Sequence, residues 1–118
     1  MSKWSGWWEQ QWLGRQMMRN LWLEIAADGL VSGDGRDCVG EFTFRGELRG
    51  DGTISLLKQY EGRHQVLYEG SNSGEGIFGT WYIGRYDSGR FALRPLAEGR
   101  AECDDVQEFA TAPETVPC

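Results

Sequence analysis

Between Leu21 and Leu96 the chain contains a series of short segments of β-strand type, separated by tight turns rich in glycine. Asp28-Gly29 and Asp51-Gly52, two of these turns, are strong hairpin signals. No helical periodicity interrupts the series. The pattern predicts an all-β fold: a small antiparallel up-and-down meander of six to eight strands, closed into a barrel or strongly curled.

Composition divides the 118 residues into three parts. Residues 1–20 are rich in tryptophan and predict an amphipathic helix, residues 21–96 form the β-barrel domain, and residues 97–118 form an acidic tail that we expect to be mobile. The tail has six acidic residues against Arg100 alone, so it carries most of the net charge of −6. The nearly neutral body argues against nucleic-acid binding, which needs a basic surface. Because we find neither a signal-peptide pattern nor an apolar stretch of membrane-spanning length, we expect a cytoplasmic protein.

The alternation of apolar residues predicts how two central strands pair. With Tyr60 opposite His64, Lys58 faces Val66 and Leu56 faces Tyr68, so that apolar side chains share one face. The other segments extend this interior. The predicted inward set is Leu21, Leu23, Ile25, Phe42, Phe44, Leu48, Ile54, Leu56, Val66, Ile77, Trp81, Ile83, Phe91 and Leu93.

Four polar or amphipathic side chains fall on the same interior face, near one loop: Lys58, Tyr60, His64 and Tyr68. Their convergence at a barrel mouth is typical of a site for a small ligand. Lys58 interrupts an apolar row, and it could bind an anionic group or pair with a carboxylate such as Asp37 or Glu41. In the alternative interpretation the row lies at the barrel end, where Lys58 reaches water and the tyrosines are wall residues.

The expected N-terminal helix places five large apolar side chains on one broad arc, with Ser5 as its N-cap and Asn20 at its end. It could cover the barrel, dock onto another protein or a second copy of the chain, or lie at a membrane surface. The predicted partner-binding residues are Trp4, Trp7, Trp8, Trp12 and Met18.

The sequence contains few residues in patterns typical of catalytic or metal-binding sites. His64 is the only histidine, and no serine near it lies in a nucleophile motif. Cys38, Cys103 and Cys118 contain no C-x-x-C pair, so we expect reduced thiols and no zinc site. We therefore expect no metal, no cofactor and no enzymatic activity.

Gly79-Thr80-Trp81, set in a meander punctuated by glycines, resembles the G-x-W motif of lipocalins and the G-T-W of avidins. In those families the motif lies on the first strand, whereas here it lies near the end of the series. The resemblance implies the calycin-like barrel architecture and carries over no binding residues.

Two functions are consistent with these features. The first is a non-catalytic module for protein interaction or assembly, which would use the tryptophan-rich helix. The alternative is a small-ligand-binding barrel with its polar mouth around Lys58.

Overall fold

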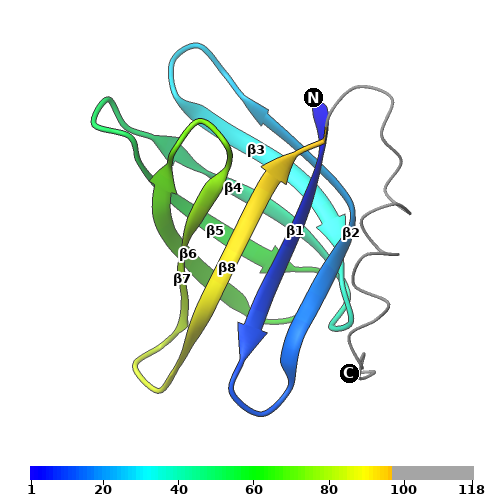
Figure 1. The fold of residues 1–118 in the computed structure, drawn as a ribbon. Helices are drawn as coiled ribbons and strands as arrows, with labels where there is room; N and C mark the ends of the chain where they lie inside the picture. The colour runs from blue at the N-terminus through cyan, green and yellow to red at the C-terminus, as the bar shows by residue number, and fades with distance from the viewer. Residues whose placement is uncertain (97–118) are drawn as a thin grey trace.

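The computed structural model describes residues 1–96, which form eight antiparallel strands closed into a barrel (Figure 1). Each strand pairs with the next in sequence, and the first pairs with the last. The strands are β1 (Ser2–Gln10), β2 (Gly14–Ile25), β3 (Leu30–Arg36), β4 (Glu41–Leu48), β5 (Thr53–Tyr60), β6 (Gln65–Asn72), β7 (Ile77–Ile83) and β8 (Asp87–Pro95). The predicted all-β, antiparallel up-and-down barrel is therefore confirmed.

The pairing of β5 with β6 follows the predicted register. Leu56 lies opposite Tyr68 and Lys58 lies opposite Val66. The backbone N–H of Tyr60 donates to the carbonyl of His64 at 3.1 Å across the short loop. A register slip of one residue would move every interior side chain of a strand to the solvent face, so burial of the apolar row fixes this register.

The core fills the inside of the barrel. Eleven of the fourteen residues predicted to point inward are buried; Ile25 and Leu48 are half-buried, and Ile83 is 36% exposed. These three lie at or next to the last residue of their strands, where the barrel opens toward solvent. An eight-stranded barrel has an interior just wide enough for side chains to fill, which agrees with this packed core.

The prediction of an N-terminal helix is wrong, because residues 2–10 form strand β1. Trp4 and Trp8 are buried in the core together with Met18 of β2. Trp7 faces outward and is half-buried, with the Arg15 guanidinium 3.7 Å from its ring centroid. Trp12, in the β1–β2 turn, is 82% exposed. The five residues therefore do not share one face, and the domain boundary between residues 20 and 21 falls inside β2.

Two irregularities explain why the strand periodicity was hidden. The pairing of β1 with β2 shifts between Trp4 and Gly6, and the pairing of β2 with β3 shifts between Arg19 and Trp22. Asn20 lies in the second shift with a positive φ of 52°. Both shifts fall within residues 19–21 of β2, where an extra residue changes which side chains face inward, so the alternation breaks in β2 but continues along β1.

The β1–β2 hairpin has its own local signals. Gly14 adopts a φ of 77°, as the last residue of a short hairpin loop often does. The Gln10 side-chain oxygen accepts hydrogen bonds from the backbone N–H groups of Trp12 and Leu13. Gly14 therefore ends a turn instead of weakening a helix.

Close contact between β6 and β7 requires a glycine at position 79. A Cβ placed on Gly79 would collide with the Glu69 carbonyl and would lie 2.5 Å from the Gly70 Cα. Gly70 and Gly79 are also cross-strand partners. The glycine of the Gly-Thr-Trp sequence therefore allows the two backbones to approach each other.

Two further expectations concern the rest of the chain. The predicted acidic tail, residues 97–118, lies outside the described residues. Cys38 is disulfide-bonded, which overturns the expectation of reduced thiols.

Candidate functional site

The candidate site is built around an ion pair inside the barrel. Lys58 projects inward from β5, and its Nζ lies 2.7 Å from Oδ2 of Asp37. Both side chains are completely buried. Pairing with a carboxylate such as Asp37 or Glu41 was one of the possibilities left open by the sequence, and the structure shows Asp37 as the partner. Lys58 therefore does not reach water at the barrel end, as the alternative interpretation required.

Asp37 reaches the interior because the β3–β4 loop folds over the barrel mouth. The backbone N–H of Asp37 donates to the carbonyl of Gly40, and that of Gly40 donates to the carbonyl of Asp37. The backbone N–H of Val39 donates to Oδ1 of Asp37 at 2.9 Å. This side-chain turn holds one carboxylate oxygen and directs the other toward Lys58. Val39 packs against the core beside it.

Three donors converge on Oδ2 of Asp37. Besides Lys58, the Tyr60 hydroxyl donates at 2.7 Å and the Trp8 indole Nε1 donates at 3.0 Å. A buried carboxylate needs such partners to offset its loss of hydration. Trp8 comes from β1, so the cluster joins the first strand to the β3–β4 loop and β5.

Tyr68 completes the polar cluster. Its hydroxyl oxygen accepts a hydrogen bond from Lys58 Nζ at 3.2 Å. Within residues 1–96 this hydroxyl donates its own proton to no acceptor, although the side chain is only 2% exposed. Burial and the nearby Asp37 charge raise the pKa of both Tyr60 and Tyr68 above the usual value, so both stay protonated as donors.

Aromatic rings surround the Lys58 ammonium on its other sides. Phe42 is nearest, with its ring centroid 4.2 Å from Nζ, and the centroid of Tyr60 lies at 4.7 Å. The rings of Tyr68, Trp8 and Phe44 follow between 5.3 and 5.9 Å. These faces stabilise a cation but solvate it less well than water does. Burial therefore lowers the pKa of Lys58 to about 8, although Asp37 acts in the opposite direction.

A small cavity of about 40 Å³ adjoins this cluster at the same end of the barrel. Its wall is mainly apolar and aromatic, and Val39 of the β3–β4 loop is part of it. Three lining residues, Trp8, Tyr60 and Tyr68, also contact Lys58 or Asp37. The full lining is Trp8, Val39, Tyr60, His64, Val66, Tyr68, Trp81 and Ile83.

All four predicted ligand-site residues therefore meet at this end of the barrel. Tyr60, His64 and Tyr68 line the cavity, and Lys58 lies beside it behind the tyrosines. His64 lies in the β5–β6 loop with its side chain largely exposed and its ring centroid 5.1 Å from that of Tyr60. His64 is thus a residue of the outer rim.

The sequence analysis missed the roles of Trp8 and the β3–β4 loop. Trp8 was assigned to a helix, so its contact with Asp37 could not be expected. The alternation of Trp4, Gly6 and Trp8 in β1 is the signal that would have placed it inside the barrel. Trp81 was predicted to point into the barrel but was not assigned to the ligand site. Its indole Nε1 donates to the Glu9 carbonyl at 2.9 Å, which fixes the ring in the cavity wall.

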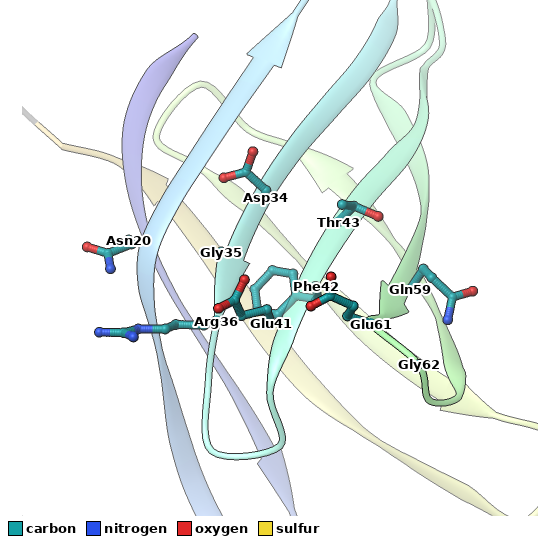
Figure 2. Close-up of a pocket in the computed structure, with 10 residues that line it drawn as sticks. All are labelled: Asn20, Asp34, Gly35, Arg36, Glu41, Phe42, Thr43, Gln59, Glu61 and Gly62. Atoms are coloured by element: carbon teal, nitrogen blue, oxygen red, sulfur yellow. The ribbon is translucent and has the colours of Figure 1, made fainter.

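A larger depression of about 690 Å³ lies on the outer surface over β3 and β4 (Figure 2). Most of the side chains that line it belong to outward positions of these strands and the β5–β6 loop. Asp34, Glu41 and Glu61 give it a mainly acidic character, with Arg36 among them. The polar side chains of this lining are exposed or half-buried, and its one buried side chain is the apolar Phe42, so the depression lacks the buried polar group that marks the inner cavity.

Comparison of the chain with protein-family models, with curated proteins and with solved structures found no significant match. In the described part of the chain, no group of three His, Cys, Asp or Glu side chains could hold a metal ion. Residues 1–96 also contain no helix of the length and apolar character needed to cross a membrane. The site is therefore interpreted from its own geometry.

Proposed function

We propose that the barrel binds a small, mainly apolar molecule with one hydrogen-bond acceptor in the cavity at its loop end. The observation that carries this proposal is the Tyr68 hydroxyl. It is buried, it belongs to a residue that lines the cavity, and among residues 1–96 it has no acceptor for its proton. A buried donor without an acceptor costs about 1–3 kcal/mol, which a ligand acceptor would recover.

The size and lining of the cavity limit the ligand. A cavity of about 40 Å³ has room for a few water molecules or a compact molecule of similar size. Its aromatic walls favour an apolar body, and a single polar contact would fix the orientation. Among the lining residues His64 and Ile83 are exposed, so these two mark the side of the cavity that faces solvent.

The interaction module that the sequence favoured has weaker support. It depended on a tryptophan-rich helix, and the residues concerned belong to β1, the β1–β2 turn and β2. Trp4, Trp8 and Met18 are covered by the barrel itself. Trp12 alone of the five is fully available to a partner, and a single exposed tryptophan is common on soluble proteins.

Nuclear magnetic resonance of the tryptophan indole groups tests the proposal. Titration with propan-1-ol, a compact molecule with one hydroxyl, should shift the Nε1–H resonances of Trp8 and Trp81, which line the cavity. The resonance of exposed Trp12 should not move and serves as an internal control.

Two variants sharpen the test. Tyr68→Phe removes the hydroxyl while keeping the ring, so it should weaken propan-1-ol binding by about five- to tenfold, as expected for one lost hydrogen bond. Tyr82→Phe is the matched control, because Tyr82 lies on the outside of β7 and is 41% exposed. Equal shifts at all three indoles, or none, would refute the proposal.

A further inference from the structure

We infer that the ligand is a small aldehyde that condenses with the Lys58 amine, forming a protonated imine paired with Asp37. This inference rests on the proposed function, because the aldehyde must first enter the cavity. It names the chemical class of the ligand and gives the buried lysine a role that simple apolar binding does not need.

The surroundings of Lys58 suit an amine nucleophile. Its Nζ is completely buried, held by Asp37 on one side and by the Tyr68 hydroxyl on another. The remaining side faces aromatic rings, of which Phe42 is nearest. A lysine desolvated in an apolar pocket is the form that reacts with carbonyl groups.

Desolvation also increases the reactive fraction of this amine. With its pKa lowered to about 8, Lys58 is unprotonated in about a tenth of molecules at pH 7. An ordinary lysine, with a pKa near 10.4, is unprotonated in only about 0.04%. The buried amine is therefore more available by roughly two orders of magnitude.

The reaction balances without any further reactant. The Lys58 nitrogen adds to the carbonyl carbon, and the carbonyl oxygen becomes a hydroxyl by taking a proton. This carbinolamine then loses water, and a C=N bond replaces the C=O bond. From the ammonium form the sum is ammonium plus aldehyde giving protonated imine plus water. Nitrogen carries the positive charge in the starting ammonium and again in the protonated imine, so Asp37 has a cationic partner before and after the reaction.

Tyr68 lies where the carbonyl oxygen must be stabilised. Its hydroxyl contacts Lys58 Nζ at 3.2 Å, and the residue also lines the cavity. A carbonyl group that approaches Nζ from the cavity would meet the unused Tyr68 proton, which can form a hydrogen bond to the developing oxyanion, while the oxygen takes its proton from the Lys58 nitrogen. Tyr68 is therefore proposed as the catalytic hydrogen-bond donor of the condensation.

Stability alone does not explain the ion pair. Replacing a buried ion pair by well-packed apolar residues is often neutral or stabilising, because desolvation offsets the attraction. Every neighbour in the predicted row of β5, Ile54, Leu56 and Tyr60, is apolar or aromatic. A lysine retained in that row, with a carboxylate brought in from a loop, is explained by chemistry at its amine.

The experiment uses propanal with sodium cyanoborohydride, which reduces an imine to a stable secondary amine. The chain has two lysines, Lys3 and Lys58, so peptide mapping by mass spectrometry compares the buried amine directly with a surface amine. We expect Lys58 to be modified at least tenfold faster than Lys3 at pH 7.5. In concentrated urea, where both side chains are solvated, the two rates should become equal.

Variants separate the roles of the two residues. Tyr68→Phe should slow modification of Lys58 at least fivefold, and Tyr82→Phe should leave it unchanged. Modification of Lys3 should be the same in both, because neither substitution lies near it. Modification of Lys3 alone in the folded protein, or of Lys58 only in urea, would overturn the inference.

Propan-1-ol distinguishes this inference from the proposed function on which it rests. Indole shifts with propan-1-ol but no propanal adduct at Lys58 would leave the binding site standing and refute the imine. The absence of both signals would refute both.

Discussion

Replacing Lys58 by methionine should destabilise the barrel by about 3 kcal/mol, the lower end of the cost of breaking a buried ion pair. The lower end applies because Asp37 would keep three donors: Trp8 and Tyr60 on Oδ2 and the Val39 N–H on Oδ1. Each hydrogen bond to a charged acceptor contributes about 1.5–3 kcal/mol, so the carboxylate would not be left bare. For a domain of this size the melting temperature should fall by about 12–24 °C.

The decisive measurement is a double-mutant cycle by urea denaturation, followed by tryptophan fluorescence. Asp37→Asn alone should cost about 2–3 kcal/mol, since it leaves the Lys58 amine without its counterion. In the double variant no charge is buried, and the asparagine oxygen can still accept from Trp8 and Tyr60. The double variant should therefore lie within about 1.5 kcal/mol of the wild type. A coupling energy below about 0.5 kcal/mol would show that the two groups do not stabilise each other, and the interpretation of the pair would be wrong.

Three further outcomes follow from the structure. Trp12→Ala should change the free energy of unfolding by less than about 0.5 kcal/mol, since the side chain is 82% exposed; a larger loss in urea denaturation would contradict its placement. Gly79→Ala should lower the free energy of unfolding by more than about 2 kcal/mol in the same assay, because its Cβ would meet the backbone of β6. Gly50→Ala is the control and should be nearly neutral, since the space around Gly50 is open. Similar costs for the two variants would refute the close contact between β6 and β7. The rate of reductive propylation at Lys58 should rise with pH up to about 8 and then level off, because only the unprotonated amine reacts. The rate at Lys3 should keep rising above that pH. If mass spectrometry gave parallel pH profiles for the two lysines, the pKa of Lys58 would not be lowered.

The pairing of the central strands could be predicted because their alternation is undisturbed. In β4 and β5 inward and outward positions alternate without a break, with only a short turn between the two strands and Leu57 as an apolar residue at an outward position. The register of β5 and β6 and the inward position of Lys58 depended on that regularity, whereas the burial of its amine and its pairing with Asp37 were left open beside the alternative that Lys58 reaches water.

The first two strands could not be found by the same reasoning. In β1, Trp7 faces outward beside inward Trp8, so apolar residues occupy both faces and obscure the alternation of Trp4, Gly6 and Trp8. The bulge at Asn20 then shifts the period within β2. Four tryptophans spaced over one arc fitted a helix equally well, and only pairing with β8, distant in sequence, decides for a strand.

The candidate ligand site was predicted only in part, because strand register reveals contacts between neighbouring strands alone. Its four polar residues lie on β5, β6 and the loop between them, where register alone brings them together. Trp8 joins the same cluster only after the barrel closes. It lies 29 positions from Asp37 in the sequence, on a strand that the sequence pattern did not reveal. Local pattern therefore predicts one wall of the cavity, and closure supplies the other.

The pairing of β1 with β8 places the two ends of the barrel sequence where they could be joined in a circular permutant. Trp4 lies opposite Pro95, and the Leu96 N–H donates to the Lys3 carbonyl, so the two ends of the described chain are neighbours. A short linker could join them covalently, and new termini could open in the exposed β4–β5 turn without removing a strand. Such a circular permutant would turn the β1–β8 pairing into a local hairpin, but β5 and β4 would become the first and last strands, and their pairing would become the most distant one. Because a closed barrel keeps one end-to-end pairing wherever the chain is opened, the permutant should fold at a rate similar to that of the natural order of strands.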